Sequence, residues 1–286
     1  MTIREAISDI ASALQTARIN EPDVEAKWII SHVLDIPLGR LLLNTRDKFP
    51  NTLHERVRSI LERRRIHEPL QHILGSVSFC GIEIEVTPDA LIPRPETELL
   101  AEAAWIWLND RSPNARRVLD IGTGTGCIPI AITRNCPTAE VHAVDISNPA
   151  LSLARRNAAR NDCTKIQFFE SDLFAGLTDQ HFDLIVSNPP YIPTAEIETL
   201  DIEVRNYDPT LALDGGDDGL DFYRRIANEA PRYLCADGIL MCEFGDGQSH
   251  ALAKMFTSGS GKVGIEQDLT GRDRFFRATF NRDVDD

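Results

Sequence analysis

The residues with the clearest chemical meaning are Asn188, Pro189, Pro190 and Tyr191, which directly follow an apolar stretch, 183–187. A planar NH2 nitrogen beside a carbonyl is a poor nucleophile, because its lone pair is delocalised. The side-chain carbonyl of Asn188 and the backbone carbonyl of Pro189 can accept its hydrogens and aim the nitrogen at a methyl donor. Two prolines stiffen the turn, and Tyr191 offers an aromatic wall to a cationic sulfonium. We predict a catalytic and substrate-binding loop; the alternative is a plain proline-rich turn.

A glycine-rich turn lies upstream, in the stretch VLDIGTGTGC, where an apolar strand runs into a helix. Glycine lets the backbone turn sharply and approach a ligand closely. Cys127 stands where a dinucleotide fingerprint needs its third glycine, which weakens a nicotinamide interpretation. We therefore predict a different nucleotide-like cofactor, against the alternative of an ordinary strand-to-helix turn. The cofactor-binding residues expected here are Gly122, Thr123, Gly124, Thr125 and Gly126.

Acidic residues follow the next two expected strands. Asp145 ends the segment VHAVD, where a carboxylate can accept hydrogen bonds from both hydroxyls of a ribose. It could instead be part of a helix cap with Ser147. Asp172 is suitably placed for an adenine amino group, with Leu173 as apolar cover for the ring. Together with the glycine-rich turn, these positions resemble the S-adenosyl-L-methionine site of class I methyltransferases.

Alternating strands and helices must position these residues. Regular alternation from residue 116 onward predicts an α/β fold, a Rossmann-like and mostly parallel sheet covered by helices on both faces. A last apolar stretch, 274–280, is expected to close the sheet as an antiparallel strand. Expected strands are 117–121, 140–145, 165–170, 183–187 and 238–243, with helices at 128–134, 149–161 and 221–233 between them.

The N-terminal part has a different pattern. Ile3, Ile7, Ile10 and Leu14 recur at helical spacing, and similar patterns continue to about residue 70, which predicts a small helical bundle. Alternating residues around Gly81 predict a β-hairpin. We expect a helical substrate-recognition domain at 1–75, a hairpin linker at 76–90 and a methyltransferase domain at 91–286.

Charge and composition restrict the partners. The formal net charge is -14, and 32 of the 44 acidic residues lie in 87–286 against 19 of the 30 basic ones. Such a surface disfavours phosphate backbones and anionic membranes. The six cysteines form no C-x-x-C pair, so we expect no metal. No signal peptide or apolar run of about eighteen residues is present, which predicts a cytoplasmic protein.

Six blocks, in this order, resemble the HemK-type peptide chain release factor glutamine methyltransferases over essentially the whole chain. The resemblance implies methylation of N5 of the glutamine in the Gly-Gly-Gln motif of class 1 release factors. It also implies cofactor contacts at Gly122–Gly126, Asp145, Leu173 and Asn188, and acceptor contacts at Asn188–Tyr191. The blocks are LIPRPETE (91–98), VLDIGTGTG (118–126), SNPPYIP (187–193), LALDGGDDGLDFYRRI (211–226), EFGDGQ (243–248) and DLTGRDR (268–274).

Two positions depart from the family pattern. Leu173 stands where some members carry an aromatic residue, and Asp208 stands where Glu is common. The segment 94–98 is expected to cover the cofactor; alternatively it is a helix-entry turn with Thr97 as the cap. Rival functions are methylation of a ribosomal-protein glutamine, methylation of a DNA or RNA amino group, and a non-catalytic adaptor. We expect a monomer that binds no nucleic acid directly.

Overall fold

A computed structural model describes residues 1–112, 116–178, 180–257 and 261–280. Its contacts divide the chain into two compact units. The helical unit consists of Met1–Ser76 together with Asp201–Tyr207, and the sheet unit of Val77–Leu200 and the chain from Asp208 on. Within the described ranges, no helix has the length and apolarity needed to cross a bilayer.

Five helices of the first 76 residues build the helical unit. The predicted stripe of α1 is buried at Ile3, Ile10 and Leu14, and Thr2 with Glu5 forms a capping box at its start. The bounds are α1 Ile3–Thr16, α2 Pro22–Leu34, α3 Leu38–Leu43, α4 His54–Arg64 and α5 Leu70–Leu74, with a 3-10 turn at Asn51–Leu53.

A later segment completes this unit. Helix α9 (Ile202–Tyr207) brings Glu203 to Arg64 of α4, whose side chain is only 1% exposed. Arg64 donates two hydrogen bonds to Glu25, at 2.8 and 2.9 Å, and one to Glu203 at 2.6 Å. The Tyr207 hydroxyl donates to the Ile66 carbonyl at 3.1 Å. A buried guanidinium with two carboxylate partners therefore holds α9 against the helical unit.

The sheet unit contains a seven-stranded sheet in the order β5-β4-β3-β6-β7-β9-β8. The pairs from β5 to β7 are parallel, whereas β9 runs antiparallel to β7 and to β8. Of the strands described in this sheet, β9 alone runs against the others. This confirms the predicted α/β class with an antiparallel last strand. The bounds are β3 Arg117–Ile121, β4 Glu140–Asp145, β5 Gln167–Glu170, β6 Phe182–Ser187, β7 Leu234–Glu243, β8 Lys262–Gln267 and β9 Asp273–Thr279.

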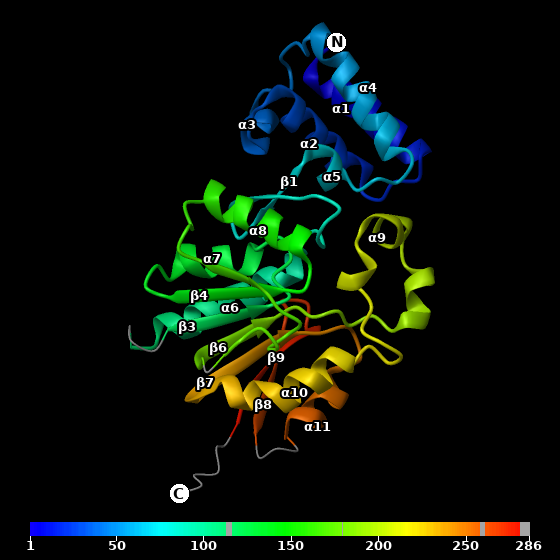
Figure 1. The fold of residues 1–286 in the computed structure, drawn as a ribbon. Coiled ribbons are helices and arrows are strands. Elements are labelled where there is room, and N and C mark those ends of the chain that lie inside the picture. The colour runs from blue at the N-terminus through cyan, green and yellow to red at the C-terminus, as the bar shows by residue number, and fades with distance from the viewer. Residues whose placement is uncertain (113–115, 179, 258–260, 281–286) are drawn as a thin grey trace, which may run out of the picture. The chain divides into compact units, whose positions relative to one another are not determined.

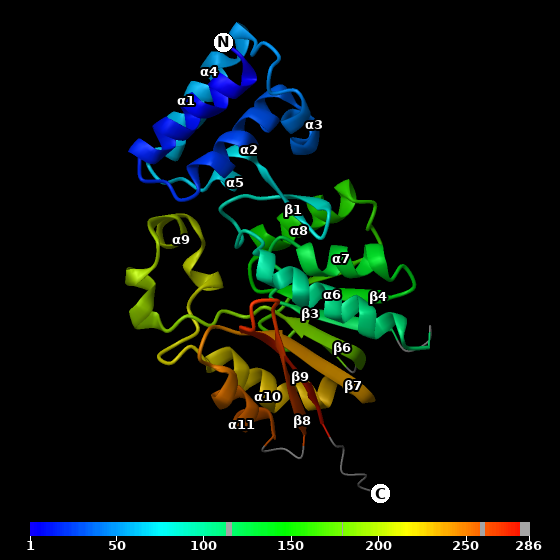
Figure 2. The ribbon, with the colours of Figure 1, turned by 180° about the vertical axis from the view of Figure 1, so that it is seen from behind.

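Helices cover both faces of this sheet (Figure 1, Figure 2). Val118 and Leu184 pack with α6 and α7 on one face, whereas Leu119 and Ile185 pack with α10 and α11 on the other. Neighbouring strand residues point to opposite faces, so two buried faces require continuous apolar runs. The helices are α6 Pro95–Asn109, α7 Cys127–Asn135, α8 Asn148–Arg160, α10 Asp221–Tyr233 and α11 Ser249–Thr257, with 3-10 turns at Thr194–Thr199 and Thr210–Ala212.

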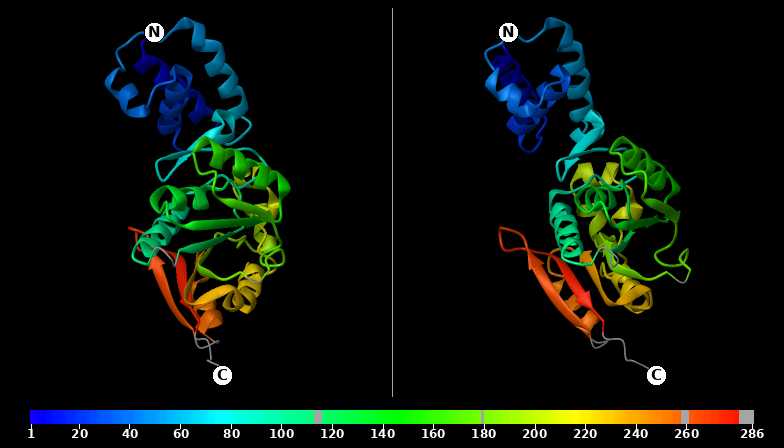
Figure 3. Two further views of the ribbon diagram at one scale, coloured as in Figure 1. Left: turned by 60° about the vertical axis from the view of Figure 1, so that its left-hand side comes forward. Right: turned by 90° about the vertical axis from the view of Figure 1, so that its left-hand side faces the viewer.

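The chain also forms a β-hairpin and an edge strand of the sheet, β8. Strands β1 (Ser76–Phe79) and β2 (Ile82–Glu85) pair as a two-stranded sheet, as the alternation around Gly81 predicts. Strand β8, however, was not predicted. Figure 3 shows β8 and β9 side by side at one edge of the seven-stranded sheet. Only Val263 and Ile265 give β8 an apolar alternation, which is too short to indicate a strand without its partner.

Candidate functional site

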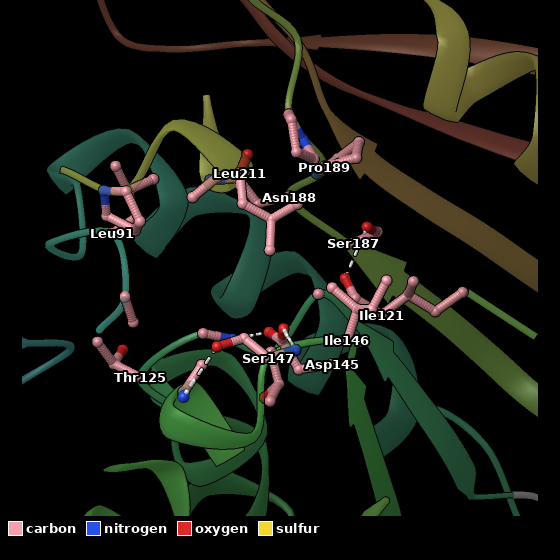
Figure 4. A pocket seen from close by; sticks show the side chains of 18 of the residues that line it. Leu91, Ile121, Thr125, Asp145, Ile146, Ser147, Ser187, Asn188, Pro189 and Leu211 are labelled. Atoms are coloured by element: carbon pink, nitrogen blue, oxygen red, sulfur yellow. Dashed lines mark hydrogen bonds between the residues drawn. The ribbon is translucent and has the colours of Figure 1, made fainter. Parts of the chain in front are cut away.

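A cavity opens at the carboxyl ends of β3, β4 and β6. Because Ile121 pairs with both Val144 and Ser187, the residues that follow them, Gly122, Asp145 and Asn188, meet at this edge of the sheet. Figure 4 shows Asn188 and Pro189 across the cavity from Asp145 and Ser147. Of the predicted residues, the cavity is lined by Gly122, Thr123, Gly124, Thr125, Asp145, Asp172, Leu173, Asn188, Pro189 and Pro190.

The glycine-rich turn has two distinct roles. Gly124 has φ +54°, and a Cβ there would meet only the Ala90 Cβ, at 3.9 Å, so this side of the turn stays open. Gly126 does not line the cavity, and a Cβ there would lie 3.0 Å from the Ala154 Cβ of α8. Gly124 thus leaves room for a ligand, whereas Gly126 allows a helix to pack closely.

Asp145 is fixed by the turns around it. Its Oδ2 accepts a hydrogen bond from the Gly124 N–H at 2.8 Å, and its Oδ1 accepts one from the Ser147 N–H at 2.9 Å. Burial raises the pKa of Asp145, while these N–H groups and that of Ile146 lower it. Ser147 itself caps α8 by accepting from the Ala150 N–H. Each carboxylate oxygen retains a further acceptor site that a ligand can use.

Asp172 and Leu173 reach the same cavity from beyond β5. Asp172 is exposed, and its Oδ1 lies 2.9 Å from Nη2 of Arg225 on α10. Leu173 is buried and has φ +53°, a left-handed conformation that is uncommon for a leucine. The apolar surface predicted at this position is therefore present, and the acidic group beside it is already partnered.

Asn188 is held by a residue from α6. Its Nδ2 donates to Oγ1 of Thr97 at 3.1 Å, and Thr97 is buried. The helix begins after Arg94, which is its N-cap and makes no side-chain capping bond. The alternative interpretation of Thr97 as the helix cap is therefore wrong, and Thr97 is instead a partner of Asn188. The carbonyl end of the Asn188 amide is left for another donor.

Tyr191 lies outside the residues that line the cavity, although we expected it to bind the acceptor. Burial raises its pKa to about 12. Its backbone carbonyl accepts from Gln248 Nε2 at 2.9 Å, and a Cβ on Gly219 would lie 2.3 Å from that carbonyl oxygen. A Cβ on Gly245 would likewise lie 2.9 Å from the Tyr191 ring. Two of the six sequence blocks therefore supply the close packing around the loop.

Two buried carboxyls near the site were not among the predicted residues. Asp120 in β3 is fully buried, and burial raises its pKa to about 7, although the nearby Thr123 side chain lowers it. Glu243 at the end of β7 is 4% exposed, and burial raises its pKa to about 7 as well. An acidic residue inside an apolar strand was the signal that could have identified both.

The segment expected to cover the cofactor, 94–98, contributes to the cavity wall through Arg94 and Thr97, and Pro93 just before it also lines the cavity. Arg94 Nη2 donates to Oδ2 of the buried Asp208 at 2.5 Å. The shorter acidic residue at position 208 therefore still reaches its basic partner. This ion pair ties the start of α6 to the chain at the point where it enters the sheet unit again after α9.

Comparison with known proteins places these features in a family. The family described as "PrmC N-terminal domain" matches residues 5–75, and the one described as "Methyltransferase small domain" matches residues 97–203. A release factor glutamine methyltransferase of Geobacter sulfurreducens is 43% identical and covers 96% of this chain and 95% of its own. One of Deinococcus radiodurans is 40% identical and covers 97% of this chain and 98% of its own.

Solved structures of lower identity share the fold. A methyltransferase from Pyrococcus furiosus is 20% identical, with a TM-score of 0.50 over 79% of this chain and 98% of its own. A ribosomal protein L11 methylase from Lactobacillus delbrueckii subsp. bulgaricus is also 20% identical, with a TM-score of 0.50 over 66% of this chain and 81% of its own. The full-length similarity to curated relatives is more specific, and it shows that this chain belongs to the release factor glutamine methyltransferase family.

Proposed function

We propose that this protein transfers a methyl group from S-adenosyl-L-methionine to the N5 amide nitrogen of the glutamine in the Gly-Gly-Gln motif of class 1 peptide chain release factors. One observation carries the proposal. Asn188 and Pro189 line the same cavity as Gly124 and Asp145, in a chain whose curated relatives are named release factor glutamine methyltransferases.

The side of the cavity formed by β3 and β4 fits S-adenosyl-L-methionine. A Cβ on Gly122 would meet nothing within 4 Å, so the backbone there can approach a ligand closely. Asp145 has acceptor sites left for ribose hydroxyls, and Leu173 offers an apolar surface to the adenine. The second oxygen of Asp172 is the expected partner of the adenine amino group.

The side formed by Asn188–Tyr191 fits a planar amide. The Asn188 side-chain oxygen and the Pro189 carbonyl can each accept one N–H of the glutamine, which orients its nitrogen. When bound, S-adenosyl-L-methionine supplies an electrophilic methyl: the N–C bond forms as the C–S bond breaks, sulfur takes the electron pair, and the amide nitrogen loses one proton. The residues of the loop accelerate this displacement by alignment, because they hold nucleophile and methyl in line.

The charge of the chain supports a protein acceptor. A formal charge of -14 repels phosphate backbones, so we expect little oligonucleotide binding at physiological salt. We assign recognition of the release factor to the predicted domain at 1–75. We further propose that the enzyme acts as a monomer in the cytoplasm, where translation termination supplies its substrate.

Mass spectrometry after reaction with labelled S-adenosyl-L-methionine tests the proposal. We expect one methyl group on the Gly-Gly-Gln peptide of a class 1 release factor, and none on a release factor whose glutamine in that motif is replaced by alanine. Ribosomal proteins and oligonucleotides are offered in parallel reactions. Label on either of these alone would contradict the proposed substrate.

A further inference from the structure

Glu243 lies beside the loop that holds Asn188. Because Ser187 of β6 pairs with Cys242 of β7, the residues that follow, Asn188 and Glu243, leave neighbouring strands side by side. Glu243 is 4% exposed, and its Oε2 has no hydrogen-bond partner among the described residues. A buried and incompletely partnered carboxyl costs stability, so its presence calls for a physical reason.

The polar contacts around Asn188 provide a reason for the buried Glu243 carboxyl. An asparagine amide has an acceptor end and a donor end, and only the acceptor end can hold the N–H of a substrate amide. Nδ2 of Asn188 donates to Thr97 Oγ1 at 3.1 Å. The Thr97 hydroxyl and the Asn188 amide also lower the pKa of the Glu243 carboxyl, so both polar groups lie close enough to stabilise its ionised form. The donor end of the amide therefore faces Thr97 and Glu243.

We propose that Glu243 is a positioning residue which, together with Thr97, holds the donor end of the Asn188 amide so that its oxygen faces the acceptor nitrogen. This inference rests on the proposed methyl transfer and assigns no contact between Glu243 and the substrate. A carboxylate accepts hydrogen bonds without donating any, so it selects one of the two orientations of the amide. A protonated carboxyl has an O–H that can instead donate to the Asn188 oxygen, which removes this selection.

The ionisation of Glu243 makes the inference measurable. Burial raises its pKa to about 7; the Thr97 side chain lowers it, nearby Glu96 raises it, and Asn188 and Arg274 lower it. Two further titratable groups, Tyr191 and Tyr223, lie near enough for Glu243 to raise their pKa values. Above pH 7 the carboxylate predominates, and there the amide is held in the productive orientation. We therefore expect the rate of methyl transfer to fall as the pH is lowered through about 7.

Glu243→Gln tests the role with little change of shape. We expect kcat to fall by about 10- to 100-fold, as for a misplaced catalytic group, while the affinity for S-adenosyl-L-methionine stays the same. The acid-side fall of kcat near pH 7 should disappear. The Tm of the variant should exceed that of the wild type at pH 8, because a buried charge is removed, and the difference should shrink at pH 6.

Variants at Tyr223 and Thr97 distinguish a positioning role of Glu243 from an effect on stability alone. Tyr223→Phe removes the hydroxyl that donates to the backbone carbonyl of Glu243 at 2.7 Å, so it perturbs the same strand without touching the carboxyl. We expect a lower Tm and an unchanged kcat. Thr97→Val should lower kcat, and Thr97→Ser should recover most of that loss because it restores the hydroxyl.

The outcomes distinguish this inference from the proposed function. All rates are measured with the acceptor that the wild type methylates. If the wild type methylates no release factor, the proposed function is wrong. If the wild type is active and Glu243→Gln keeps the same kcat and pH profile, the positioning role is wrong. It is also wrong if kcat falls only because the Tm of the variant is lower.

Discussion

The two sides of the cavity are built in different ways. On the side proposed to bind the cofactor, Asp145 accepts hydrogen bonds from Gly124 and Ser147, which lie in the turns directly after β3 and β4. On the side proposed to bind the acceptor, the Asn188 side chain is held by Thr97, which lies 91 positions earlier in the chain, and the Tyr191 carbonyl by Gln248, 57 positions later. The cofactor side is therefore assembled by adjacent turns, and the acceptor side by distant segments.

Because of this difference, we expect substitutions on the two sides of the cavity to have different effects. A turn that is satisfied by its neighbours keeps its geometry if one partner is lost, so its failure should appear as weaker binding. A loop held by distant segments changes its geometry when any of them changes, so its failure should appear in the rate of reaction. The following variants test this contrast, in order of decreasing effect.

Asn188→Ala should have the largest effect. It removes the side-chain oxygen proposed to hold the acceptor amide, and losing one such group typically lowers kcat about 10²- to 10³-fold. Single-turnover methylation measures this, and binding of S-adenosyl-L-methionine serves as the control. Methyl transfer at the wild-type rate would remove Asn188 from the catalytic site.

Asp145→Asn should act on the cofactor side through binding. One carboxylate oxygen becomes an NH2 group, which cannot accept from Gly124 or Ser147 or from a ribose hydroxyl. Losing a charged hydrogen bond costs about 1.5–3 kcal/mol, so we expect roughly 10- to 100-fold weaker binding of S-adenosyl-L-methionine by calorimetry. Asp172→Asn, whose carboxyl already pairs with Arg225, should weaken binding less. Equal losses in the two variants would contradict the assigned roles.

A comparison of Gly219→Ala with Gly247→Ala measures how much the stability of the protein depends on close packing around the loop 188–191. Both glycines have positive φ, +73° and +83°, so both variants strain the backbone. A Cβ on Gly219 would also lie 2.3 Å from the Tyr191 carbonyl oxygen, whereas one on Gly247 would meet nothing within 4 Å. We expect Gly219→Ala to be less stable by a further 1–3 kcal/mol, about the cost of overpacking. Denaturant unfolding measures the difference, and equal stabilities would show that the loop tolerates movement.

Asp120→Asn should give the smallest effect, which depends on pH. Burial raises the pKa of Asp120 to about 7. Because this value lies above the ordinary one, the wild type loses stability as the pH rises through 7. From pH 6 to pH 8 the variant should gain about 1 kcal/mol relative to the wild type. Thermal unfolding at both pH values tests this, and a gain that is independent of pH would contradict ionisation of Asp120 as the cause.

Local patterns predicted much of this protein. Strands β3 and β4 begin and end where the apolar runs do, at 117–121 and 140–145, because each is buried on both faces. The glycine-rich turn, Asp145 and Asn188 were likewise identifiable, since strand ends and turns impose their residue types within a few positions. The order of six sequence blocks was enough to indicate the family.

Tertiary structure decided what those patterns leave open. Thr97 has the sequence context of a helix cap, yet it partners Asn188 because α6 packs against β6. Glu243 becomes a neighbour of Asn188 through the register of β6 with β7, and α9 joins the helical unit through the Arg64–Glu203 contact and the Tyr207 hydrogen bond to Ile66. Hydrogen bonds and close packing act over a few ångströms in space, whatever the separation in the chain. The sequence alone thus determined which residues end each strand, and the fold determined which of them act together.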